Sequence, residues 1–168
     1  MNIGLLSDTH GYLDPKLLDF FEDCDEIWHA GDFGSMDVVS QLENFKPLRG
    51  VYGNIDGKPI NYNFPEHQNF LIDGIKIWMT HIGGYPPNYS PSIKEKLNEE
   101  KPDLFICGHS HILKVMPDKK RKGLLHINPG AAGHHGFHQI RTAIRFCINR
   151  DGVSNLEVIE LGKRGRLV

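Results

Sequence analysis

The sequence is poor in cysteine and lacks long apolar runs. Its three cysteines, Cys24, Cys107 and Cys147, contain no Cys-x-x-Cys pair. An odd and scattered set of thiols argues against a disulfide framework and favours reduced thiols in a cytoplasmic protein. No apolar run approaches the roughly 20 residues that cross a membrane, and the first residues show no signal-peptide pattern. We therefore expect a cytoplasmic protein with no membrane partner.

The sequence also lacks an excess of charge of either sign. Nineteen basic and 21 acidic side chains give a formal net charge of −2, which disfavours a nucleic-acid partner. Residues 119–122 form one basic run beside Asp118 and Gly123, typical of a solvated hairpin tip, with a phosphate-steering patch as the alternative. A chain of 168 residues predicts a single domain over residues 1–168.

The apolar pattern predicts a mixed α/β fold. The first third alternates strands and helices, whereas the rest consists mostly of β-hairpins with one helix between them. The expected strands are residues 3–6, 26–29, 48–52, 66–71, 75–80, 104–107, 112–116, 124–128, 141–149 and 153–161. The expected helices are residues 16–23, 36–44 and 92–100. This order indicates parallel strands covered by helices, together with a second, antiparallel sheet.

Five of the expected strands end in side chains that can bind a metal ion. These side chains are Asp8 and His10, Asp32, Asn54, His81, and His109 with His111. Ligands of open α/β sheets bind in the crevice outside the carboxyl ends of the strands. One such residue alone is more often a cap or a satisfied polar group. Five strand ends of the same kind indicate one shared site.

The candidate ligands are two carboxylates, one amide and four imidazoles. These are too many for one four-coordinate metal and suit two metals that share a bridging group, and the lack of cysteine argues against structural zinc. Mixed oxygen and nitrogen ligands suit Mn²⁺, our first choice, and also Fe²⁺, Zn²⁺, Ni²⁺ or Co²⁺. Two metals about 3.5–4 Å apart can generate a hydroxide near neutral pH and orient a phosphate.

These motifs together resemble the calcineurin-like metallophosphoesterase superfamily, and most closely its short YfcE-type phosphodiesterases. The resemblance runs from Ile3 to about Gly133 and rests on Asp8-Thr9-His10, Gly31-Asp32, Gly53-Asn54-Ile55-Asp56, His81 and Gly108-His109-Ser110-His111. It implies a four-layer α-β-β-α sandwich of two mixed sheets flanked by helices. It also implies a bridging hydroxide nucleophile and two metals, the first held by Asp8, His10 and His111, the second by Asn54, His81 and His109, and both by Asp32.

The chain departs from the family pattern at Ile55. Most of the superfamily has a histidine there, which stabilises the phosphoryl transition state and protonates the leaving group, and an isoleucine can do neither. The neighbouring Asp56 either orients a histidine ligand or caps the turn. His134, His135 and His138 could supply the proton, unless they belong to an ordinary polar surface loop. The candidate catalytic residues are thus Asn54, Asp56 and His135.

We therefore expect a phosphodiesterase that hydrolyses small phosphate esters with good leaving groups. The alternative is a non-catalytic metal-binding or protein-interaction scaffold that resembles the retromer subunit Vps29. Seven clustered ligands favour the enzyme, because repelling carboxylates and buried polar groups are costly to keep together without metal. His29, His67 and His126 are expected to be structural or surface residues. The last hairpin could offer a sheet edge for a homo-oligomer.

Overall fold

The computed structural model describes residues 1–165 and contains two five-stranded sheets. The strands of the first sheet are β1 (Asn2–Leu6), β2 (Glu26–His29), β3 (Leu48–Gly50), β9 (Ile140–Asn149) and β10 (Gly152–Lys163). The strands of the second are β4 (His67–Ile72), β5 (Ile75–Thr80), β6 (Leu104–Ile106), β7 (Leu113–Pro117) and β8 (Leu125–Pro129). Their spatial orders are β10-β9-β1-β2-β3 and β4-β5-β6-β8-β7.

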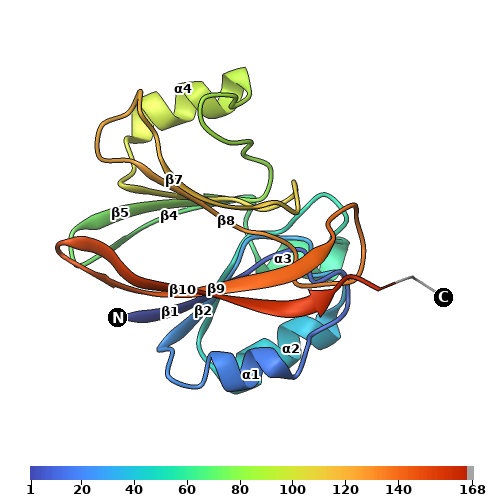
Figure 1. Cartoon of the computed structure of the whole chain (residues 1–168). Coiled ribbons are helices and arrows are strands. Elements are labelled where there is room, and N and C mark those ends of the chain that lie inside the picture. Colours follow the sequence, from blue (N-terminus) through green and yellow to red (C-terminus); the bar gives the residue numbers. More distant parts are fainter. Residues whose placement is uncertain (166–168) are drawn as a thin grey trace.

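The helices complete a four-layer arrangement (Figure 1). They are α1 (Lys16–Phe20), α2 (Met36–Phe45), α3 (Lys58–Asn63) and α4 (Pro91–Glu100). The first two cover the outer face of the first sheet, and α4 covers the outer face of the second. The structure confirms the α/β sandwich of two mixed sheets flanked by helices. No helix in the described part of the chain is long and apolar enough to cross a membrane.

Apolar side chains fill the spaces between the layers. Along β1, Ile3 and Leu5 face the second sheet whereas Leu6 faces α1 and α2, as the two-residue period of a strand requires. The cluster between the sheets includes Ile3, Leu5, Trp28, Ile77, Met79, Ile106, Ile127, Ile144 and Phe146. A second large cluster lies beneath α1 and α2, and a smaller one lies beneath α4. The sheets are therefore held face to face by a continuous apolar layer.

Parallel pairing brings the carboxyl ends of several strands to one end of the molecule. In the first sheet, Trp28 pairs with Leu5 and with Arg49, so β1, β2 and β3 all run in the same direction. The strands β5, β6 and β8 are likewise parallel. The loops that follow the two sheets meet, because the His109 backbone N–H donates a hydrogen bond to Asp8 Oδ2 at 3.1 Å.

The structure differs from the sequence expectation in several places. The second sheet is mixed rather than antiparallel, because β5, β6 and β8 pair in parallel. Strand β3 ends at Gly50 rather than at residue 52. Helix α1 ends at Phe20 rather than at residue 23, and the helix α3 was not predicted. The apolar pattern of α3 is weak, since Ile60 is its only buried residue. In the basic hairpin tip the lysines are exposed, but the Asp118 carboxylate is buried and pairs with Arg121 at 3.1 Å. This tip is therefore a structured turn.

Candidate metal centre

The loops after β1 and β2 are joined by backbone hydrogen bonds that set their side chains side by side. Asp8 N–H donates to the Gly31 carbonyl at 2.9 Å, and His10 N–H donates to the Asp32 carbonyl at 3.1 Å. In the second sheet, Gly108 N–H donates to the His81 carbonyl at 2.9 Å. The loops after β1 and β2 and the loops after β5 and β6 thus lie at the same end of the sandwich, and they carry the candidate ligands.

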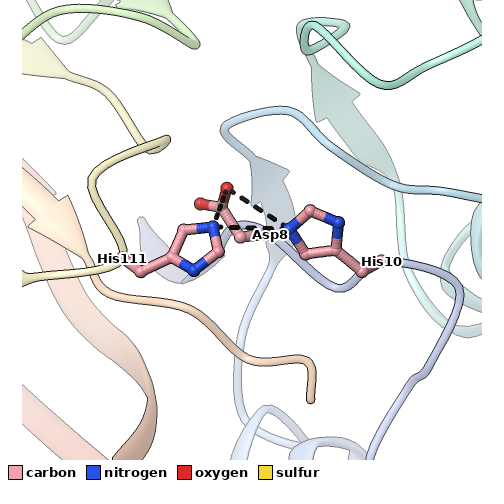
Figure 2. A group of neighbouring side chains, drawn as sticks. All are labelled: Asp8, His10 and His111. Carbon is pink, nitrogen blue, oxygen red and sulfur yellow. Dashed lines mark hydrogen bonds and ion pairs between the residues drawn. The ribbon is translucent and has the colours of Figure 1, made fainter. Parts of the chain in front are cut away.

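Asp8, His10 and His111 form the first ligand group (Figure 2). His111 Nε2 lies 3.0 Å from Asp8 Oδ1 and 3.3 Å from His10 Nε2, and His10 Nε2 lies 3.9 Å from the same carboxylate oxygen. The three ligand atoms point toward one another, with the carboxylate between the two imidazoles. Atoms about 2.1 Å from a common ion would be separated by roughly 3–3.5 Å, so this spacing is close to what one ion requires.

Asp32, His81 and His109 form the second ligand group, and their ligand atoms lie within 4.8 Å of one another. His81 Nε2 is 3.2 Å from Asp32 Oδ2 and 3.1 Å from Asn54 Oδ1, so the amide oxygen belongs to the same cluster. The His81 and His109 ring centroids are 5.2 Å apart. The structure thus brings together all seven side chains that the sequence proposed as ligands.

Asp32 lies between the two groups. Its Oδ2 atom is 3.2 Å from His81 Nε2 and 3.9 Å from His10 Nε2, one histidine from each group. Its other oxygen, Oδ1, accepts a hydrogen bond from the Ile55 backbone N–H at 3.1 Å. One carboxylate oxygen is therefore fixed by the protein while the other faces both groups.

A buried oxygen without a hydrogen bond supports the assignment of this cluster to a metal. Asp8 Oδ1 is shielded from solvent and accepts no hydrogen bond from any residue among 1–165. A buried carboxylate oxygen is costly to leave without a hydrogen bond or a cation. The surrounding imidazoles and carboxylates are the donors that transition metals prefer, so the residues present fit divalent cations.

The backbone of the ligand loops is strained. Asp8, His10, Asp32, His109 and His111 all have φ between 48° and 65°, a left-handed conformation that non-glycine residues rarely adopt. Within the described residues, the only other non-glycine positions with positive φ are Asp73, Lys101 and Asn155. Such strain persists where the surrounding fold enforces it and is concentrated at functional sites. Five of the seven candidate ligands are thus held in place by their backbone.

The surroundings of Asp32 favour its ionised form. Burial raises the pKa of Asp32, but the hydrogen bond and charge of His81 outweigh it, so this pKa lies below its ordinary value. Burial lowers the pKa of His81, whereas Asp32 and Asp8 raise it by a larger amount. Burial lowers the pKa values of His10 and His109, which keeps their rings neutral and able to donate a lone pair.

Backbone contacts orient His81 toward the cluster. Its Nδ1 lies 2.8 Å from the Ala30 carbonyl and must donate to it, because a carbonyl oxygen only accepts. The opposite nitrogen, Nε2, therefore faces Asp32 and Asn54. A hydrogen bond on the far side of a ligand histidine typically fixes its tautomer and ring orientation.

His29 contacts the loops that carry the ligands but belongs to neither ligand group. Its Nδ1 accepts from the Gly31 backbone N–H at 3.1 Å, so its Nε2 donates to Thr9 Oγ1 at 3.0 Å. The ring is fully buried and stacked on Phe33, and burial lowers its pKa to about 3. A neutral His29 thus ties the loop after β1 to the loop after β2.

Asp56 holds the backbone of two loops. Its Oδ2 accepts from Gly53 N–H at 2.8 Å and Phe33 N–H at 3.2 Å, and its Oδ1 accepts from Gly34 N–H at 2.9 Å. No histidine in residues 1–165 donates a hydrogen bond to it. Of the two expected roles, the structure shows the turn-capping one, so Asp56 positions the loops. Its role as a candidate catalytic residue stays a prediction.

The histidine-rich loop after β8 reaches the cluster. The exposed His135 ring lies 5.7 Å from the His10 ring, and His138 Nδ1 lies 3.1 Å from His111 Nδ1. His134 instead contacts the Arg164 carbonyl. The sequence identified this loop and proposed His135 as its catalytic residue. The order of the three histidines does not reveal which of them faces the metal ligands, so the contact of His138 with His111 was not predicted.

A cavity of about 550 Å³ opens beside the second ligand group. Asn54 and His81 form its wall on the side of the cluster, and Tyr52, His67 and Lys96 contribute to the remaining walls. Its volume lies in the range of small-molecule sites, about 300–1,000 Å³. The sequence analysis expected His67 to be a structural or surface residue and did not predict that it lines this cavity.

Comparison with known proteins agrees with this geometry. A family model described as "Calcineurin-like phosphoesterase superfamily domain" matches residues 1–151. A phosphodiesterase of Methanocaldococcus jannaschii is 32% identical over 148 residues, which cover 77% of this chain and 83% of that protein. A probable metallophosphoesterase of Methanothermobacter thermautotrophicus is 29% identical over 136 residues, or 78% of this chain and 77% of that one.

Solved structures show the same architecture. A structure described as a novel archaeal phosphodiesterase has a TM-score of 0.75 at 26% identity and covers 96% of this chain and 100% of its own. The Vps29 of Entamoeba histolytica, complexed with zinc, has a TM-score of 0.75 at 16% identity. The match covers 98% of this chain and 100% of the Vps29 chain. The latter likeness shows the fold alone. Given the family match over residues 1–151 and the convergent ligand loops, the chain belongs to the calcineurin-like phosphoesterase superfamily.

Proposed function

We propose that this protein is a metal-dependent phosphodiesterase that hydrolyses small phosphate esters. The observation that carries the proposal is the convergence of two ligand groups around the Asp32 carboxylate, with an unpartnered Asp8 oxygen beside them. The names of the relatives, metallophosphoesterase and phosphodiesterase, support the same chemistry. Two divalent ions held there would supply a bridging hydroxide near neutral pH and neutralise charge on the phosphoryl oxygens.

The protein side chains divide between holding the ions and handling the substrate. Asp8, His10 and His111 would hold the first ion, Asn54, His81 and His109 the second, and Asp32 both. Manganese is our first choice for this mixture of imidazole and oxygen ligands, with iron, zinc, nickel or cobalt also suitable. The exposed His135, whose ring lies 5.7 Å from the His10 ring, is the candidate for delivering a proton to the leaving oxygen.

The side chain at position 55 supports a preference for good leaving groups. Ile55 is 48% exposed, and its backbone N–H donates a hydrogen bond to Asp32, so its backbone lies next to the ligand groups. An isoleucine offers no proton where most of the superfamily has a histidine. Loss of a general acid typically slows such a step by about 10²–10⁴-fold, and activated esters suffer least because their alcohols leave unprotonated.

A cytoplasmic location is part of the same proposal. Cys24, Cys107 and Cys147 are all unpaired in the described structure. Burial raises the pKa of Cys24 to about 11 and that of Cys107 to about 12, which makes both thiols unreactive. Unpaired, unreactive thiols are typical of proteins in reducing compartments.

A Vps29-like scaffold is the second candidate function. The observation in its favour is the TM-score of 0.75 to the Vps29 of Entamoeba histolytica, a protein of the same architecture that is complexed with zinc. Metal binding alone therefore does not separate the two functions, whereas hydrolysis of a phosphodiester would be expected only of the enzyme.

The test combines metal analysis with turnover of bis(p-nitrophenyl) phosphate in the presence of Mn²⁺. We expect the purified protein to bind two ions per chain and to release p-nitrophenol, and we expect Asp8→Asn to abolish release. Asp151→Asn, in the exposed turn between β9 and β10, is a control that should leave both unchanged. Metal binding without hydrolysis would support the scaffold, and neither metal nor hydrolysis would refute the phosphodiesterase proposal.

A further inference from the structure

The cavity beside the second ligand group is larger than a phosphate requires. Its wall at the metal centre consists of Asn54 and His81, and it extends from there toward the amino-terminal half of α4. A phosphate monoester would occupy only the end near the ligands. The remaining volume suits a second ester group, which a phosphodiester possesses and a monoester lacks.

Lys96 is the basic side chain that lines this cavity. Every lysine or arginine ion pair found in residues 1–165 uses an arginine, so no carboxylate neutralises the Lys96 ammonium. The acidic group in the wall, Glu66, is mostly exposed and accepts a hydrogen bond from Tyr52 at 3.4 Å. The α4 side of the cavity therefore carries positive charge.

The other walls suit an organic group. The rings of Tyr52 and His67 offer flat surfaces, and Ser92 offers a hydroxyl near Lys96. His67 Nδ1 is engaged with Thr80 Oγ1 at 2.8 Å. Burial and the charge of Lys96 lower the pKa of His67, which keeps its ring neutral. The cavity lining therefore combines the flat rings of Tyr52 and His67 with the cation of Lys96.

We propose that this cavity binds the second ester group of a phosphodiester and that Lys96 selects groups with a negative charge of their own, such as a nucleotide phosphate. The inference rests on the proposed phosphodiesterase function and names the substrate class of that site. A charge-assisted hydrogen bond between Lys96 and a remote phosphate strengthens binding by about 10-fold.

The test uses two substrates that differ only in a remote phosphate. They are the p-nitrophenyl ester of thymidine 5′-phosphate and the same ester with an added 3′-phosphate. We expect the bisphosphate ester to have a KM about 10-fold lower in the unmodified protein with Mn²⁺. Lys96→Met should remove this preference, so that the two esters have equal KM values. Lys94→Met, on the same helix but outside the cavity lining, should retain the preference.

Calorimetric binding of thymidine 3′,5′-bisphosphate and thymidine 5′-phosphate gives the same comparison without turnover. Equal affinity for the two nucleotides, or a preference that survives Lys96→Met, would overturn the inference while leaving the phosphodiesterase proposal intact. Tighter binding of the bisphosphate without hydrolysis of either ester would support the cavity assignment and refute the phosphodiesterase.

A separate observation concerns the far side of His111. His138 Nε2 lies 3.0 Å from the Gly133 carbonyl and must donate to it. In a neutral ring, His138 Nδ1 is then an acceptor, so His111 Nδ1, 3.1 Å away, is the donor between them. This leaves the lone pair of His111 Nε2 directed at Asp8 and His10.

We infer that His138 is a positioning residue that fixes the tautomer of His111 for metal binding. His81 has the same arrangement, with the Ala30 carbonyl in the place of His138. The loop is shaped for this contact, because Gly136 has φ of 118° and any Cβ there would collide with the His111 ring. Removing such a partner typically weakens metal binding by about 10–100-fold.

Two variants separate this role from a general loss of packing. A glutamine can accept from His111 through its oxygen and donate to Gly133 through its nitrogen, whereas a leucine can do neither. We expect His138→Leu to weaken Mn²⁺ binding by about 10–100-fold in calorimetry and His138→Gln to restore it to within about 3-fold. His134→Leu in the same loop is the control, since His134 contacts the Arg164 carbonyl.

The tautomer itself can be read in the unmodified protein. Nitrogen-15 NMR of the metal-free, isotope-labelled chain should place the His111 proton on Nδ1. A proton on Nε2 would overturn the inference, even if the leucine variant failed to fold. Unchanged Mn²⁺ affinity in a folded His138→Leu variant would overturn it as well.

Discussion

His126 offers a test of how this fold treats a buried, unpartnered imidazole. It lies in β8 with no exposed surface, and neither ring nitrogen has a hydrogen-bond partner in the part of the chain that the structure describes. Its ring packs near Phe105 and Tyr89, at centroid separations of 5.7 Å and 6.0 Å. Burial lowers its pKa from 6.5 to about 4.

These values set both the sign and the size of a pH effect. Below pH 6.5 the unfolded chain takes up a proton at His126, whereas the folded protein does so only near pH 4. The unfolded state thus binds more protons, so stability falls as the pH falls through this window. The loss amounts to about 2 kcal/mol between pH 7 and pH 5.

Urea unfolding of the metal-free protein, followed by tryptophan fluorescence, measures this loss. Metal must be removed because ligand protonation makes metal binding depend on pH. Both His126→Leu and His126→Gln should lose about 2 kcal/mol less stability than the unmodified protein between pH 7 and pH 5, a difference of about 1 M in urea midpoint. At pH 7, the leucine variant should also be the more stable of the two, because it buries no unpartnered polar atom.

The two variants together make the reasoning refutable. Suppose that the free energy of unfolding of the unmodified protein differs from that of both variants by the same amount at pH 7 and at pH 5. His126 then does not titrate as its burial requires. If only the leucine variant reduces the pH dependence, packing rather than protonation is responsible.

Three further substitutions test the site. Asp32→Ala should lose both metal ions in elemental analysis because its carboxylate faces both groups, and full metal occupancy would contradict the bridging role. Ile55→His should raise turnover of esters with poor leaving groups more than that of activated esters, and equal gains would contradict the general-acid argument. Asp56→Ala should leave three backbone N–H groups without an acceptor and lower the Tm by roughly 10 °C, about 3 kcal/mol, in calorimetry; an unchanged Tm would show that water replaces the carboxylate.

The ligand set could be predicted from the sequence because strand ends are marked by local patterns. Asp8, His81 and His109 each stand two residues after an apolar run, and parallel strands end at a common edge. The convergence of these side chains therefore follows once strand direction is known. The positive φ of five ligands could not be anticipated, because tertiary contacts rather than local propensity impose it.

Other features depend on contacts between distant segments. His138 and His135 are three residues apart, yet His138 contacts the Nδ1 side of His111 whereas the His135 ring lies near the His10 ring. Helix α3 buries a single side chain, too few for its period to show in the sequence. His126 alternates with apolar residues in β8, and sequence alone could not decide whether its ring met a partner or an apolar wall.

Each ligand group draws on both sheets. In the first group, Asp8 and His10 follow β1 whereas His111 follows β6, and in the second Asp32 follows β2 whereas His81 and His109 follow β5 and β6. An ion in either group would be a cross-link between the two halves of the sandwich, closing a loop of about 100 residues in the first group and about 50 to 80 in the second. Metal supply would then set the lifetime of the folded chain as well as its chemistry, and a cell short of metal would hold a protein whose sheets separate more readily.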